Sequence, residues 1–198
     1  MGPRGGGFQG RSALAVASAL ALALALSACA SGPTGTLYDL AAATPPPAHA
    51  VRAQFRVGQA TATADLDSDH ILVRESQALA TLADARWPEP LPALFRARLA
   101  QSFQNAGLAR WIDGPAANAN YEVDLDIRAF ELDAQTKEIH VDIAAWVVSL
   151  GTGRVMADQI FTLRTPVAST DAANVAAAMD QAASTVMSEI VAFVAKKL

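Results

Sequence analysis

The most constraining feature of this chain is a run of alternating residues from Tyr121 to Thr165. Apolar residues fill every second position, first at Tyr121, Val123, Leu125, Ile127 and Ala129, and then at Ile139, Val141, Ile143, Ala145 and Val147. A period of two is typical of β-strands that bury one face. A third strand is expected from Arg154 to Thr165, and the short connections predict an antiparallel meander. The phase shift at Phe130 and Leu132 predicts a β-bulge.

Two other segments have the spacing of amphipathic helices. Apolar residues recur every four positions after a proline-rich entrance, at Leu91, Phe95, Leu99 and Phe103, and Gly107 suits the C-terminal cap. A second stripe consists of Val175, Met179, Ala182, Val186, Ile190 and Phe193, with Ser169, Thr170 or Asp171 as the N-cap. Shorter strands are expected at 53–57, 71–73, 78–82 and 108–112. We therefore predict an α+β fold, an antiparallel sheet with both helices packed on one face.

The N-terminus has the pattern of a secretory signal. Arg4 and Arg11 precede an apolar run over residues 13–26, which closes on Leu26-Ser27-Ala28-Cys29. A transmembrane helix is the alternative, but a span needs about 20 apolar residues, and this run is shorter. The ending looks like a bacterial lipobox. It predicts cleavage between Ala28 and Cys29 and a covalent acyl and diacylglycerol lipid on Cys29, which would anchor the chain to a membrane.

The residue after the anchor bears on which membrane it enters. In well-studied Gram-negative envelopes an Asp at this position tends to retain lipoproteins in the inner membrane, and Ala30 stands here. We therefore expect an outer-membrane lipoprotein whose body faces the periplasm. Residues 29–50, rich in Gly, Pro, Thr and Ala, are interpreted as a tether, with residues 37–40 as either a short edge strand or an unstructured segment. The folded domain is expected over 51–198.

Charge and cysteine content exclude several classes. The whole chain has 15 basic and 19 acidic residues, and residues 1–28 contain Arg4 and Arg11 but no acid, so the remainder has a formal net charge of −6. That balance argues against nucleic-acid binding and against peripheral binding to anionic lipid. Cys29 is the single cysteine, so no disulfide is expected.

No pattern of catalytic or metal-binding residues stands out. His49, His70 and His140 have no ligand spacing, and a metal site needs three or four converging ligands. Asp124 and Asp126 lie two apart on one strand face, where paired carboxylates could act as acid and base, but a solvated strand face explains them more simply. We predict no enzyme, no metal and no cofactor other than the lipid on Cys29.

Two tryptophans are candidate partner or lipid contacts. Trp87 lies just before the first helix, where packing against Leu91 or Phe95 is the simpler interpretation. Trp146 shares a strand face with Ala144 and with other apolar residues, so the end of that strand is apolar on both sides. If the helices cover one face, the other is covered by the N-terminal strands, by a second subunit or by a partner protein.

The order of these features resembles the ABC-type transport auxiliary lipoprotein family of PqiC/YmbA type. The likeness is carried by the lipobox, a Tyr-x-Leu segment at 38–40, a strand ending Ile71-Leu72-Val73-Arg74, and Trp87-x-Glu89-Pro90-Leu91 at the start of a helix. It covers nearly the whole mature chain, although only 71–99 is specific at motif level. Residues 66–70 and Pro88 depart from the family pattern, in loops that could face a partner.

The resemblance implies a non-catalytic accessory role in lipid transport between two membranes. The implied partners are an MCE-domain protein and its ABC permease and ATPase, and a homo-oligomer is a further expectation. The alternatives are a structural or assembly lipoprotein of another envelope complex, and a periplasmic protein that binds lipid itself.

Overall fold

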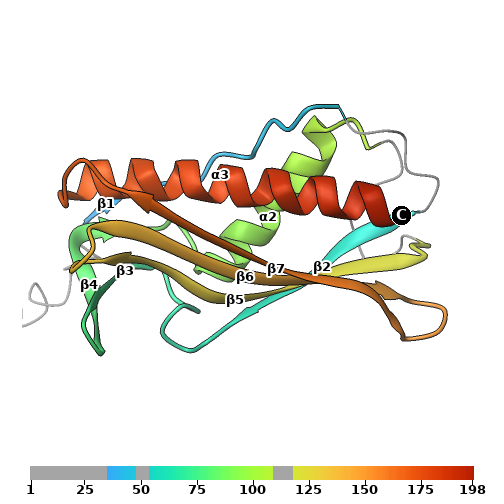
Figure 1. Ribbon diagram of the computed structural model, residues 1–198, viewed down its shortest axis with the longest axis horizontal. Helices are drawn as coiled ribbons and strands as arrows, with labels where there is room; N and C mark the ends of the chain where they lie inside the picture. The colour runs from blue at the N-terminus through green and yellow to red at the C-terminus, as the bar shows by residue number, and fades with distance from the viewer. Residues whose placement is uncertain (1–34, 48–53, 109–117) are drawn as a thin grey trace, which may run out of the picture. The chain divides into compact units, whose positions relative to one another are not determined.

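A seven-stranded sheet forms the centre of the fold (Figure 1). The computed structural model describes residues 35–47, 54–108 and 118–198. The strands are β1 (Thr36–Leu37), β2 (Phe55–Ala62), β3 (His70–Glu75), β4 (Ala78–Arg86), β5 (Tyr121–Asp133), β6 (Glu138–Ser149) and β7 (Val155–Pro166). Their order is β1-β4-β3-β5-β6-β7, and β2 pairs with β5 beside this path. Helices α2 (Leu91–Asn105) and α3 (Ala172–Lys197) pack on one face, which confirms the α+β prediction.

The predicted meander is present as β5, β6 and β7. Both pairings are antiparallel, and the register between β5 and β6 shifts between Ile127 and Ala129, where the sequence predicts a bulge. Because of this shift, Phe130 and Leu132 point into the core together with Val123 and Ile127.

Three pairings are parallel, which the sequence analysis did not anticipate. Strands β2 and β3 both run parallel to β5, at residues 121–127 and 131–133 respectively, and β1 runs parallel to β4. The chain returns through α2 before β5 begins, and a crossover of this kind produces parallel neighbours. The sheet is therefore mixed, although its long strands are antiparallel.

The helix ends follow the predicted chemistry. Pro92 lies in the first turn of α2, and Gly107 follows the helix with a φ of +68°. Asp171 is the N-cap of α3, where its carboxylate accepts a hydrogen bond from the Asn174 N–H at 3.1 Å. Hydrogen bonds with Ser169 and then with Asn174 lower the pKa of Asp171 to about 2.

Residues 35–47 correct the predicted tether. Leu40 and Ala43 are 1% and 0% exposed. The Ala43 N–H donates to Ser102 Oγ at 2.8 Å, and Asn105 Nδ2 donates to the Ala43 carbonyl at 2.8 Å. This part of the segment is therefore docked on α2, and the folded unit begins at Gly35. Glycine and proline content suggested a linker, but apolar side chains and hydrogen bonds hold the segment in place. Further hydrogen bonds run from the Tyr38 N–H to the Arg86 carbonyl and from the Ala41 N–H to Asp180 Oδ1.

Several predictions fall outside the described residues. These are the signal peptide, Cys29 with its cleavage site, the first residues of the strand at 53–57, and most of the short strand at 108–112. Within residues 35–47, 54–108 and 118–198, no helix is both long and apolar enough to cross a bilayer.

Candidate functional site: the outer face of the sheet

The sheet face turned away from α2 and α3 carries most of the polar chemistry of the domain, and we refer to it as the outer face. Cross-strand pairs place Asp124 beside Trp146, Trp146 beside Asp158, and His140 beside Arg164. The opposite face holds Val123, Leu125, Ile143 and the other core residues beneath the helices. The alternation predicted from the sequence therefore separates a polar outer face from a buried core.

A groove of about 870 Å³ opens where β2 meets the first half of β5. Its walls come from the β2 backbone, the first turn of α2 and the outer-face side chains Arg56, Glu122, Asp124 and Trp146. The β2 strand is irregular here, because its register on β5 shifts between Val57 and Ala60. Such a bulge bends the strand and exposes its backbone groups.

Ion pairing and close packing shape the floor of this groove. The Arg56 guanidinium pairs with Glu122, and the Gln59 N–H donates to Asp124 Oδ1 at 3.1 Å. Burial, followed by the nearby negative charge of Glu122, raises the pKa of Asp124. Gly58 lies so close to both acids that a Cβ atom at this position would lie 2.5 Å from Glu122 Cγ. A glycine is required here for the close approach of strand and side chains.

One arginine of α2 ties the helix to the irregular strand. Arg96 donates from Nε to the Gly58 carbonyl at 2.6 Å and from Nη2 to the Val57 carbonyl at 3.1 Å. These carbonyls lie at the shift in the β2 register, where the ladder leaves them free for other donors.

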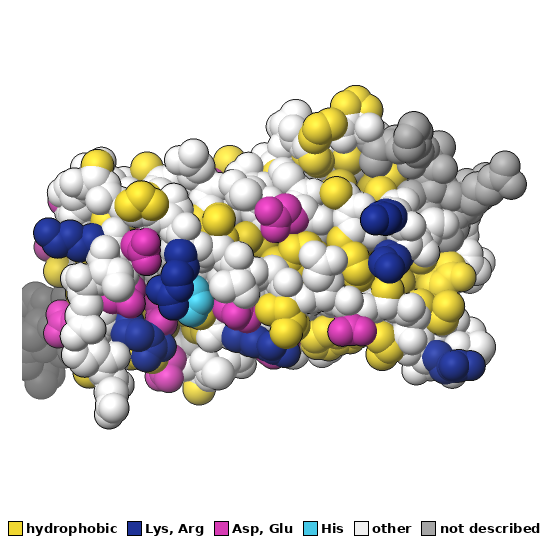
Figure 2. Space-filling view, in the orientation of Figure 1, with side chains coloured by type: hydrophobic (Ala, Val, Ile, Leu, Met, Phe, Trp, Pro, Cys, Tyr) yellow, Lys and Arg dark blue, Asp and Glu magenta, His cyan; other side chains and the backbone are white. Residues whose placement is uncertain are grey.

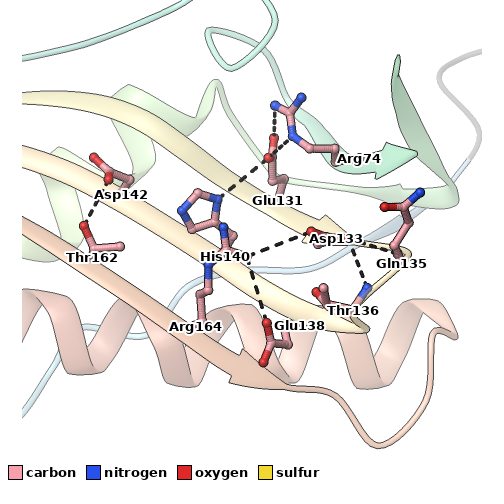
Figure 3. A network of polar contacts seen from close by, with 10 residues as sticks. All are labelled: Arg74, Glu131, Asp133, Gln135, Thr136, Glu138, His140, Asp142, Thr162 and Arg164. Atoms are coloured by element: carbon pink, nitrogen blue, oxygen red, sulfur yellow. Dashed lines mark hydrogen bonds and ion pairs between the residues drawn. The ribbon is translucent and has the colours of Figure 1, made fainter. Parts of the chain in front are cut away.

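A second polar cluster lies at the other end of the outer face (Figure 3). Glu131 is 2% exposed and accepts two hydrogen bonds from the Arg74 guanidinium, one of them from Nη2 at 2.9 Å. His140 Nδ1 is 3.9 Å from the same carboxylate. Burial and then the charge of Arg164 lower the pKa of His140, so the ring is neutral at pH 7. The cluster joins β3, β5, β6 and β7 by polar contacts.

The two tryptophans have different surroundings. Trp87 is 1% exposed and packs edge-to-face on Phe130, with ring centroids 6.1 Å apart. Its position is that of a core side chain, and a partner could reach it only by displacing the core. Trp146 is half-buried on the outer face and lines the groove. The face around it carries no helix in the described part of the chain, so the expected cover by N-terminal strands is limited to β2 at its margin.

Sequence reasoning missed the residues that surround Trp146. Arg56, Gly58 and Glu122 belong together only because β2 runs parallel to β5, and Arg74 meets Glu131 for the same reason with β3. Their spacing of more than 50 residues has no local pattern. The one feature of the sequence that pointed to these residues was the charge at alternate positions of the predicted strands.

Apolar side chains also reach solvent near this site. Ile160, Met156 and Val155 of β7 are 54%, 58% and 57% exposed. In Figure 2, hydrophobic side chains gather at the lower right, over the same end of the sheet. Among the described residues no three His, Cys, Asp or Glu side chains converge as metal ligands. Apolar, aromatic and charged side chains lie together on this part of the surface.

Comparison with known proteins places the folded domain in a family. Residues 36–191 match the family model described as "ABC-type transport auxiliary lipoprotein component". This chain belongs to that family. The matched range begins one residue after the folded unit begins and ends within α3, so the family domain is the unit seen in the structure.

Two solved structures and a curated relative are similar to this chain over most of its length. A crystal structure of a Xanthomonas campestris protein with the family description DUF330 is 27% identical, covers 82% of this chain and 96% of its own, and superposes with a TM-score of 0.73. An uncharacterised protein of known structure is 12% identical, covers 82% and 99% of the two chains, and has a TM-score of 0.64, which shows a shared fold. An uncharacterised protein of Bradyrhizobium diazoefficiens is 26% identical over 150 residues, or 74% of this chain. This chain spans about two fifths of that relative, since the match covers 40% of its length.

Membership in this lipoprotein family assigns the chain to the cell envelope.

Proposed function

We propose that this protein is a non-catalytic accessory component of an ABC/MCE-type system that transports lipid between two membranes. Acylated Cys29 would hold it in the outer membrane, and the domain would dock in the periplasm on the MCE protein and its ABC permease and ATPase. The observation that carries the proposal is the match of the whole folded unit to the family of ABC transport auxiliary lipoproteins.

The geometry supports a binding role over an enzymatic one. The groove beside Trp146 is lined by Arg56, Glu122 and Asp124, which are held by one another or by backbone groups. The half-buried Trp146 and the exposed Ile160 give this face the mixture of aromatic and polar groups found at protein interfaces.

The packed segment 35–47 changes the expected reach of the anchor. The folded unit begins at Gly35, six residues after Cys29, and a chain of six residues reaches at most roughly 20 Å. The domain would then lie close to the membrane that holds its lipid.

A pulldown from detergent-solubilised envelopes tests the proposal. The full chain carries a tag after Leu198 and is compared with Cys29→Ala and with Trp146→Ala, and partners are identified by mass spectrometry. We expect the wild-type protein to recover an MCE protein with its ABC subunits and Trp146→Ala to recover less. Recovery of cell-wall or unrelated outer-membrane components alone would move the assignment to a structural lipoprotein.

A role in binding lipid directly is the second candidate, because the groove beside Trp146 has the volume for an acyl chain. Its charged walls disfavour such a ligand, since an apolar chain would desolvate Arg56 and Asp124. Extraction of the purified chain followed by lipid mass spectrometry decides between the two: stoichiometric co-purified lipid, lost in Trp146→Asp, would favour the carrier.

A further inference from the structure

Strand β7 is a long edge of the sheet. The strand order ends at β7, and in the described ranges no other strand pairs with its outer side. It is 12 residues long, and its ladder with β6 is unbroken from Glu138 opposite Pro166 to Val147 opposite Ala157. An edge of this kind presents a row of unpaired N–H and C=O groups.

The register shows which residues supply those groups. The Val167 N–H donates to the Lys137 carbonyl at 3.0 Å, one step beyond the pair Glu138 and Pro166. Because pairing alternates along an antiparallel ladder, odd-numbered residues of β7 direct their backbone toward β6 and even-numbered ones direct it outward. The outward positions are Asp158, Ile160, Thr162 and Arg164, all of them exposed.

This edge lacks most of the features that block pairing. Between Val155 and Pro166 the charged residues are Asp158 and Arg164, with no lysine, and the proline comes last. Ile160, in the middle, is 54% exposed. The Met156 end is interrupted, since the register with β6 shifts between Val147 and Val148. A regularly paired segment of about ten residues is left for a partner.

We propose that β7 pairs antiparallel with β7 of a second copy of this chain, about a twofold axis that passes through Phe161. In this register Asp158 lies opposite Arg164 of the second copy, and Arg164 lies opposite the Asp158 of that copy. Ile160 faces Thr162 in the same symmetric way. All four outward residues then exchange backbone hydrogen bonds, and both charges on the edge are neutralised.

Neighbouring registers do not have this complementarity. A shift of two residues in one direction sets Asp158 opposite Thr162 and Arg164 opposite Met156, so neither charge meets an opposite charge across the pair of strands. A shift in the other direction sets Asp158 opposite Pro166, which has no N–H to donate. Charge complementarity and backbone hydrogen bonding therefore favour the register in which Asp158 of each β7 lies opposite Arg164 of the other.

The symmetry has a structural consequence for the outer face. A twofold axis perpendicular to the sheet keeps the helices of both copies on one side. The two sheets become continuous, and the two outer faces form one surface that includes both Trp146 side chains. This inference uses β7 alone and does not depend on the proposed transport role.

Charge reversal tests the register. Two differently tagged full chains are co-expressed, envelopes are solubilised in detergent, and the recovery of one tag with the other is measured for Asp158→Arg, Arg164→Asp and the double variant. We expect each single variant to reduce self-association by about tenfold, because like charges meet at two symmetric positions. The double variant exchanges both signs and should return to within about twofold of wild type.

Backbone substitution tests the pairing itself. Ile160→Pro removes an outward N–H without touching the ladder to β6, and it should abolish self-association, whereas Ile160→Ala should largely retain it. Arg154→Asp makes the same charge change as Arg164→Asp outside the paired segment and should behave as wild type. Thermal unfolding of each variant checks that the domain is folded.

Three results would overturn the inference. The double variant could remain as weak as the single variants, Ile160→Pro could associate as well as Ile160→Ala, or the wild-type chain could fail to recover itself while β7 cross-links to a different protein. In the last case the edge accepts a foreign strand.

Discussion

Two carboxylates on the outer face, those of Glu131 and Asp124, are partly or fully removed from water, which disfavours their charged forms unless other groups stabilise them. Glu131 is 2% exposed, yet its carboxylate has two hydrogen bonds from Arg74 and a neutral His140 beside it. A buried acid is tolerated when a guanidinium forms paired hydrogen bonds with it. The carboxylate of Asp124 is less well compensated. Burial and the negative charge of Glu122 raise its pKa more than the hydrogen bond from the Gln59 N–H lowers it.

Arg74→Met should lower the free energy of unfolding by about 2 kcal/mol, because it leaves the Glu131 carboxylate buried without its partner. Urea unfolding followed by circular dichroism measures this. Arg164→Met is the matched control, since Arg164 is 3.9 Å from both Asp133 and Glu138, and it should change stability by less than about 0.5 kcal/mol. Equal effects for the two variants would contradict the structure.

Asp124→Asn should change the pH dependence of stability. The pKa of Asp124 is higher in the folded state than in the unfolded state, so ionised Asp124 opposes folding above that pKa, and acidification relieves the effect. The stability of Asp124→Asn relative to wild type should therefore improve as the pH rises from 3 to 7. Melting temperatures across this range measure the difference, and an advantage that grows toward low pH would refute the assignment.

At the scale of single elements, an irregular strand shapes the groove. The β2 bulge lets Arg96 reach two carbonyls and brings Gly58 against the acids of β5. In a regular strand these carbonyls would bond to the neighbouring strand and could not accept hydrogen bonds from Arg96. The bulge in β2 therefore helps to place Arg56, Glu122 and Trp146 around the groove.

Gly58→Ala should destabilise the domain by about 1–3 kcal/mol, since the added methyl group overlaps Glu122 and Asp124 and must push them from their partners. The same substitution in an Asp124→Ala background should cost less, because part of the space is then free. Chemical denaturation of the four proteins in this cycle gives the coupling. Additive effects would show that the clash lies elsewhere.

For the molecule as a whole, the N-terminal segment is part of the fold. Residues 35–47 pack on α2, with Leu40 and Ala43 buried and Ser102 accepting a backbone hydrogen bond. The proposed anchor at Cys29 and the domain are therefore closer in the chain than composition suggested.

Truncation tests this boundary. A chain that begins at Gly35 should unfold with the same free energy as one that begins at Cys29, whereas one that begins at Ala48 should lose about 3 kcal/mol, chiefly from the burial of Leu40. Calorimetry or urea unfolding of the three proteins measures the loss. Equal stability of all three would restore the interpretation of 29–50 as a tether.

The sequence by itself determined the elements whose evidence is local. Alternation in β5 and β6, the bulge after Ile127, the stripes of α2 and α3, and the Asp171 cap are written in neighbouring residues, because strand and helix periods are set by the backbone. The family could be identified from the same stretch, 71–99, together with the order of elements.

The tertiary structure decided what depends on distant parts of the chain. The parallel pairing of β2 and β3 with β5, the meeting of Arg56 with Glu122 and of Arg74 with Glu131, and the docking of residues 35–47 join segments 50 or more residues apart. Such contacts leave no periodic trace in the sequence, because they depend on strand order and on which surfaces remain to be covered after the core has formed.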